Sequence, residues 1–157
     1  MIGFLVAPTL RLVHESMTVK PYEWQHDPVI LNCYGKDFSK LQLERAISYW
    51  SSKGYSVAFY EMDPSEKICK SYHLDGFIIL RKAKDKDLKS STLAETTRLT
   101  SRTKIKSVVI LFKPGTQNLT NLIEHELGHA FGFSHIEEEG HIMHPRYDKM
   151  GSLFWIP

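Results

Sequence analysis

The spacing of hydrophobic and polar positions predicts strands through the first two-thirds of the chain and helices at two places. Runs of branched and aromatic residues are typical of strands, because such side chains pack well on a pleated, half-buried surface. A more polar stretch at residues 92–99 suits the edge of a sheet, where one side stays in water. The other predicted strands cover residues 2–7, 29–34, 55–60, 76–80 and 107–112.

Two segments carry apolar residues at helical spacing instead. The first covers residues 43–50, with Ser39 as its expected N-cap. The second begins at residue 118 or 120 and ends near Phe131. The order of elements predicts an α+β (α/β-like) fold, in which two main helices pack against a mixed sheet of about five strands.

Composition and charge exclude several classes of protein. The chain has 157 residues without a linker, repeat or change in composition, so residues 1–157 are predicted to form a single domain. A net charge of +2 is too small to indicate nucleic acid or an anionic membrane as a partner. No apolar run approaches the roughly 20 residues that a membrane-spanning helix needs. A monomer is the default expectation.

The expected compartment and the state of the cysteines are linked. Residues 2–7 lack a preceding basic region and a following cleavage site, so they are interpreted as a strand and not as a secretory signal. The protein is expected to be synthesised in the cytoplasm. Its later release by lysis and its association with a virus particle are both left open. Cys33 and Cys69 could pair, but two unpaired, mostly buried thiols are favoured without an export signal.

Residues 125–135 contain a pattern that indicates a metal site. His125 and His129 are four positions apart, so on a helix they differ by only about 40° and point the same way, one turn apart. Two imidazoles can therefore meet one ion, and zinc is the expected metal. Glu126 lies beside the metal at about 100° from His125, where a carboxylate can take a proton from zinc-bound water.

The third expected ligand is His135, which cannot come from the same helical face. Six residues after His129, it would point about 240° away if the helix continued. Gly132 lies between the two histidines and can adopt the left-handed conformation that ends a helix. The glycine is therefore predicted to bring His135 back to the metal. His141 and His144 lie nearby and are the alternatives to His135 as third ligand.

The long histidine motif resembles that of the metzincin zinc proteases, which also have a methionine-containing turn under the metal. Residues 142–147, with Met143, Pro145 and Tyr147, are similar to the turn of the matrixin branch. Weaker likenesses upstream extend the resemblance over residues 29–147. The family implies a twisted metzincin-type sheet and a minimal catalytic domain that hydrolyses peptide bonds. Acidic loops that would bind structural calcium are not evident, and residues 153–156 would pack as a short tail.

The resemblance also implies roles for individual residues. His125, His129 and His135 would bind one Zn²⁺, Glu126 would be the general base, and Met143 would form an apolar floor. A polypeptide substrate would bind in extended form along the edge strand near Ala94. Pro145 to Tyr147 would form the outer wall of the pocket for the residue after the scissile bond, and Asn121 would set the depth of that pocket. Leu122 is a further implied substrate-binding residue.

A second class of function is left open by the same residues. A zinc-stabilised structural or binding module, such as a component of a larger particle, would keep the metal for stability and cleave nothing. Glu126 argues against this alternative, because a structural site tolerates any residue there and usually fills its fourth position with protein.

Overall fold

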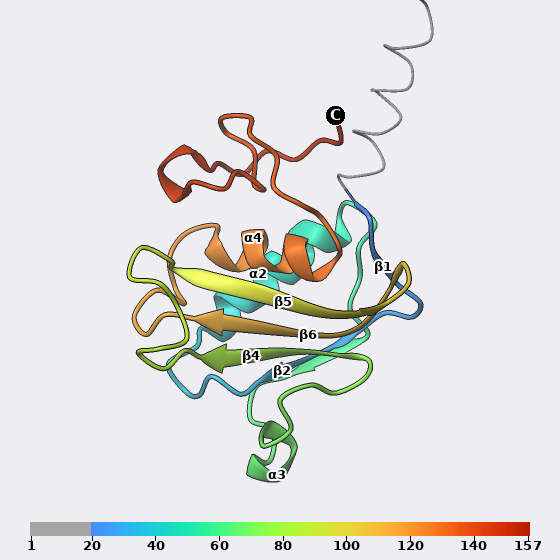
Figure 1. The fold of residues 1–157 in the computed structure, drawn as a ribbon, viewed down its shortest axis with the longest axis vertical. Coiled ribbons are helices and arrows are strands. Elements are labelled where there is room, and N and C mark those ends of the chain that lie inside the picture. The colour runs from blue at the N-terminus through green and yellow to red at the C-terminus, as the bar shows by residue number, and fades with distance from the viewer. Residues whose placement is uncertain (1–19) are drawn as a thin grey trace, which may run out of the picture.

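The computed structural model of the chain describes residues 20–157, and the strand expected at residues 2–7 lies outside them. Six strands form one mixed sheet in the order β1-β6-β4-β2-β3, with β5 on the other edge of β6 (Figure 1). Only β5 is antiparallel to its neighbour, and all the other pairs are parallel. The strands are β1 (Glu23–Trp24), β2 (Val29–Asn32), β3 (Phe59–Glu61), β4 (Phe77–Lys82), β5 (Ala94–Ser101) and β6 (Lys104–Phe112).

The two main helices, α2 (Lys40–Ser51) and α4 (Leu122–Ala130), lie side by side against one face of this sheet (Figure 1). The predicted N-cap of α2 is confirmed, because the Ser39 hydroxyl accepts a hydrogen bond from the Gln42 N–H. Two short helical elements were not predicted. They are α3 (Glu66–Cys69) and the 3-10 helix η1 (Tyr147–Lys149).

The core lies between the helices and the sheet. Alternate residues of β6 point to it, so that Val108, Ile110 and Phe112 contact the helices while the residues between them face the opposite side. Trp50 of α2 is fully buried and donates its indole N–H to the backbone oxygen of Glu124 in α4. This bond joins the two helices, and the histidine-bearing helix also packs directly on β5 and β6.

The C-terminal segment runs back over α4 as the expected short tail, but only part of it packs (Figure 1). Phe154 stacks edge-on against Trp50 and Phe133. Leu153 and Ile156, which were expected to pack with it, are instead 60% and 52% exposed.

The expectation of two unpaired cysteines is wrong. Cys33 and Cys69 form a disulfide, with their Cα atoms 5.6 Å apart. The physical reason is the parallel pairing of β2 and β3. Parallel strands end at the same edge of a sheet, so Cys33 after β2 lies near the loop that follows β3 and leads to Cys69. Among the described residues, no helix is long and apolar enough to cross a membrane.

Candidate metal centre

The backbone of α4 and of the turn after it positions the three histidines. Two of them are on α4, and the helix ends as Gly132 adopts a φ of +107°. The N–H groups of Gly132 and Phe133 then donate to the last turn of the helix, which reverses the chain toward His135. The turn is tight, since a Cβ atom on Gly132 would lie 2.0 Å from the backbone oxygen of Tyr22.

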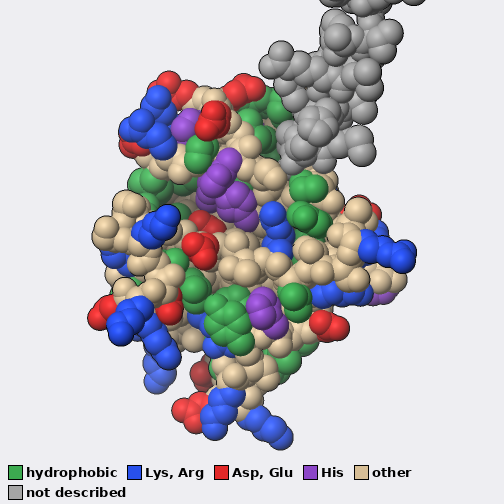
Figure 2. Space-filling view, in the orientation of Figure 1, with side chains coloured by type: hydrophobic (Ala, Val, Ile, Leu, Met, Phe, Trp, Pro, Cys, Tyr) green, Lys and Arg blue, Asp and Glu red, His purple; other side chains and the backbone are tan. Residues whose placement is uncertain are grey.

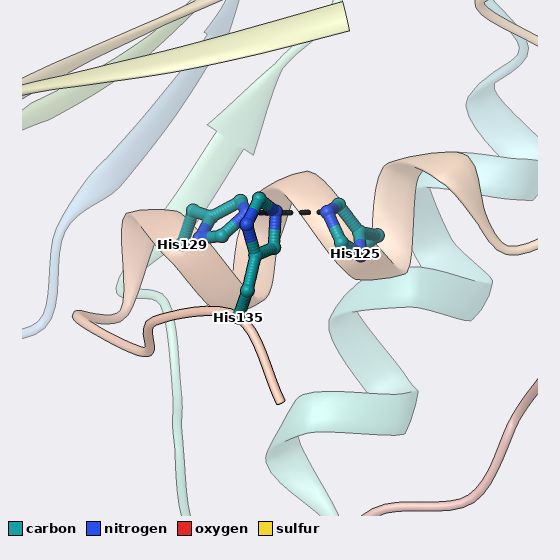
Figure 3. A group of neighbouring side chains, drawn as sticks. All are labelled: His125, His129 and His135. Atoms are coloured by element: carbon teal, nitrogen blue, oxygen red, sulfur yellow. Dashed lines mark hydrogen bonds between the residues drawn. The ribbon is translucent and has the colours of Figure 1, made fainter. Parts of the chain in front are cut away.

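The imidazoles of His125, His129 and His135 face one another (Figure 3). The Nε2 atom of His129 lies 3.1 Å from that of His125 and 3.0 Å from that of His135. Nitrogen ligands about 2.0–2.1 Å from a tetrahedral ion lie about 3.3 Å apart, so this spacing is close to that of a zinc site.

The hydrogen bonds behind two of the rings decide where their protons lie. His125 donates from Nδ1 to the backbone oxygen of Ile142 at 2.7 Å, and His129 donates from Nδ1 to that of Phe133 at 2.8 Å. A carbonyl oxygen can only accept, so Nδ1 carries the proton and Nε2 carries a lone pair. Lone pairs that converge without a proton between them repel one another, and a cation among them removes that repulsion. The residues therefore fit a metal ion.

Partial or full desolvation favours the neutral form of these imidazoles, which is the state that binds a metal. Desolvation lowers the pKa of His125 to about 4. Desolvation, together with the neighbouring His125, lowers the pKa of His129 to about 3. The pKa of His135 is also lowered, mainly by desolvation.

Glu126 points from the same helix toward the edge strand β5. The residue is only 4% exposed, and its Oε2 atom accepts a hydrogen bond from the Thr96 hydroxyl at 2.5 Å. Burial raises the pKa of Glu126 to about 7, and the hydrogen bond from Thr96 acts in the opposite direction. A carboxyl group with a pKa near neutrality is suited to accept and release a proton at neutral pH.

Met143 lies under the helix turn that joins the two α4 histidines. It is fully buried, and a Cβ atom added to Gly128 would lie 2.3 Å from its sulfur and 2.7 Å from the Trp50 ring. Only a residue without a side chain lets Met143 and Trp50 approach α4 this closely. Gly128 stands at an unassigned position of the histidine motif, and sequence reasoning gave it no role.

A cavity of about 660 Å³ opens in front of the histidines. Figure 2 shows histidine side chains gathered on this face between β5 and the C-terminal segment, with acidic side chains beside them. Four of the expected substrate-binding residues line the cavity, namely Ala94, Leu122, Pro145 and Tyr147. Asn121 does not line it. It precedes α4 in a left-handed conformation with a φ of 64°. Because Asn121 is not among the lining residues, its expected role in setting the depth of the pocket stays a prediction.

Comparison with known proteins identifies the family. A family model described as matrixin matches residues 35–154, well over half of the chain. The chain belongs to the matrixin family. A search of curated proteins finds no match. The family and the histidine triad together support a zinc metalloprotease type of function for this matrixin domain, and the mixed sheet with its helices is consistent with it.

Neither alternative third ligand belongs to the histidine group of the matrixin domain. His141 is fully buried, accepts the Met143 N–H on Nδ1 and donates from Nε2 to the backbone oxygen of Trp155. His144 lines the cavity and accepts the Arg146 N–H on Nδ1. Among the described residues, the group that could hold a metal ion consists of His125, His129 and His135.

Two residues of β5 that sequence reasoning left without a role contact α4. Thr96 bonds to Glu126, and Arg98 donates to the backbone oxygens of His129 and Phe133 at 2.7 and 3.3 Å. Both follow Ala94 at intervals of two, which on a strand places all three on one face. The alternation of residues along the strand could have shown that these three side chains share a face. It could not have shown that this face contacts α4.

Proposed function

We propose that the chain is a zinc-dependent endopeptidase that hydrolyses peptide bonds with Glu126 as its general base. One observation carries the proposal: the Nε2 atoms of three histidines converge beside a buried carboxylate at the wall of a cavity. Within the described residues the group offers three donors. A structural zinc site usually has four protein ligands, whereas a catalytic site leaves one position for water or substrate.

The proposed mechanism divides the work between the metal and the protein. Zinc held by His125, His129 and His135 would polarise a water molecule and the carbonyl group of the scissile bond. Glu126 would accept a proton from the attacking water and deliver it to the leaving amine. Because helix geometry fixes Glu126 beside His125, the carboxylate needs little rearrangement to serve both transfers.

We further propose that the substrate is a polypeptide bound in extended form along β5 near Ala94. Among the described strands β5 pairs only with β6, so its other edge has unpaired backbone groups. Residues at the start of this strand and on the opposite wall, around Pro145 and Tyr147, line the same cavity. Backbone hydrogen bonds to such an edge would hold peptides of many sequences, with the wall selecting among side chains.

The test combines metal content with peptide cleavage. Zinc-loaded wild type should bind one zinc per chain and cleave members of a mixed peptide library. Glu126→Gln should keep its zinc and lose activity by a factor of about 10² or more. Glu124→Gln is the matched control, since Glu124 lies on the same helix but does not line the cavity, and it should remain active.

Two results would reject the proposal. Glu126→Gln that cleaves as fast as wild type would exclude Glu126 as the base. A wild type that binds zinc, loses its fold with a chelator and cleaves no peptide would instead identify a zinc-stabilised structural or binding module.

A further inference from the structure

The face of β5 that meets α4 is formed by alternate residues of the strand. Ala94, Thr96 and Arg98 are half-buried on this face, while Glu95 and Thr97 between them are exposed. The Thr96 hydroxyl lies 2.5 Å from Oε2 of Glu126 and 3.3 Å from the backbone oxygen of the same residue. Thr96 therefore contacts the residue proposed as the general base, and it does so from an element outside the helix.

The direction of this hydrogen bond follows from the groups involved. In the ionised state, in which Glu126 can act as a base, the carboxylate can only accept, so the hydroxyl donates, and Oε2 is its nearer acceptor. No hydrogen bond from a described residue ends on Oε1, and Glu126 lines the cavity. One carboxylate oxygen is thus held by the protein, and the other is free to accept a proton from water.

Thr96 is also suited to hold the carboxylate in a fixed orientation. Its branched side chain has few accessible rotamers on a strand, so little freedom remains to be lost when the bond forms. The terminal torsion of a glutamate is soft by comparison. A single hydroxyl at Oε2 therefore defines an orientation that the glutamate alone would not keep.

We propose that Thr96 is a positioning residue that orients the Glu126 carboxylate for proton transfer. This inference rests on the proposed endopeptidase function. Without the hydroxyl the carboxylate would rotate, and proton transfer would slow because the reacting groups leave their productive geometry. Substrate binding would change little, since the bond is made to Glu126 and not to the substrate.

The experiment compares three variants with zinc-loaded wild type and Glu126→Gln. Thr96→Val removes the hydroxyl at nearly constant volume, Thr96→Ser keeps it, and Thr97→Val makes the same change on the exposed face of β5. Thr96→Val should lower kcat by about 10- to 100-fold with KM changed less than about 3-fold, as expected for a lost hydrogen bond to a charged group. Thr96→Ser and Thr97→Val should stay within about 3-fold of wild type.

Zinc content, thermal unfolding and crystal structures supply readouts that do not depend on turnover. Thr96→Val should bind zinc as wild type does, and its thermal unfolding should show that it is fully folded at the assay temperature. Structures of the zinc-loaded proteins should show the Glu126 carboxylate beside Thr96 in wild type and rotated in Thr96→Val. Loss of zinc, or unfolding at the assay temperature, in Thr96→Val would overturn the proposal, because the residue would then be structural.

The failure of this inference is distinguishable from that of the proposed function. If Thr96→Val has the wild-type kcat while Glu126→Gln is inactive, only the role of Thr96 is rejected. If wild type itself cleaves nothing, the proposed function and this role fall together.

Discussion

The Nδ1–H of His125 donates to the backbone oxygen of Ile142, so the first histidine of the triad is oriented by the residue that precedes Met143. That segment is in turn held from two sides. The oxygen of Met143 accepts the Ile136 N–H, and the Met143 N–H donates to His141, whose other ring nitrogen contacts the C-terminal tail at Trp155. Partners of this kind fix the orientation of a ligand and affect metal affinity.

Replacing His141 should weaken both the fold and the proposed zinc site. His141→Ala leaves a buried donor at Met143 and a backbone acceptor at Trp155 without partners, and we expect a loss of about 2–4 kcal/mol in the free energy of unfolding. Zinc affinity should fall about tenfold. Denaturant unfolding and competition with a chelator measure the two effects. His26→Ala, at an exposed histidine, is the control and should change neither.

If zinc affinity stays at the wild-type value in His141→Ala, the hydrogen bonds from the C-terminal tail through His141 to Met143 do not affect metal binding. The loss of stability alone would then reflect only the local hydrogen bonds.

Gly132→Ala should be much more damaging than an alanine at another glycine with positive φ. At Gly132 the new Cβ atom would meet the Tyr22 oxygen at 2.0 Å, whereas at Gly115, with a φ of +89°, it would meet nothing within 4 Å. Gly115→Ala should therefore cost only about 1–2 kcal/mol from its left-handed conformation. Gly132→Ala should cost at least about 3 kcal/mol and weaken zinc binding, because the turn that carries His135 must shift.

Unfolding in denaturant and zinc titration of the two variants check this difference. Equal losses of stability would mean that backbone conformation alone, and not the close approach to Tyr22, makes glycine necessary at position 132.

Breaking the disulfide should destabilise the domain without changing the metal centre. Cys33 and Cys69 are 36 positions apart, and a closed loop of this length should stabilise the fold by about 3–4 kcal/mol. We expect the double variant Cys33→Ser/Cys69→Ser to unfold at lower denaturant and to bind one zinc as wild type does. Equal unfolding midpoints for wild type with and without a reductant, with free thiols counted in each, would contradict the pairing.

The metal-free protein should lose stability as the pH falls below about 6.5. The folded pKa of His125 is about 4, below the ordinary value of 6.5, so the unfolded state binds more protons between these limits. The contribution of His125 to the free energy of unfolding is fully present above pH 6.5 and is lost as the pH falls toward 4. Between pH 7.5 and 5 this loss should be about 1–2 kcal/mol. Denaturant unfolding with a chelator present measures it.

The variant His125→Asn provides the matched control for this pH dependence, because an amide does not titrate and can still donate to Ile142. Its stability should vary less with pH than that of wild type. An unchanged slope would show that His125 is not the group responsible.

Residues close together in the sequence were the ones that sequence reasoning placed well. The N-cap Ser39 and the helical spacing of His125 and His129 depend only on local backbone geometry, which repeats from one helix to the next. The strand β1 and the helix α3 were missed because they contain two and four residues, too few for any periodicity to appear.

Contacts between distant segments were decided by the tertiary structure alone. The disulfide depends on how β2 and β3 pair, and the bond from Thr96 to Glu126 depends on which face of β5 meets α4. Neither relation leaves a local signal, because strand register and helix packing are set by the whole core. The sequence by itself thus determined which side chains could hold a metal and where the helix that carries two of them lies. Only the folded chain decided what surrounds them, since burial and hydrogen bonding arise from residues far away along the chain.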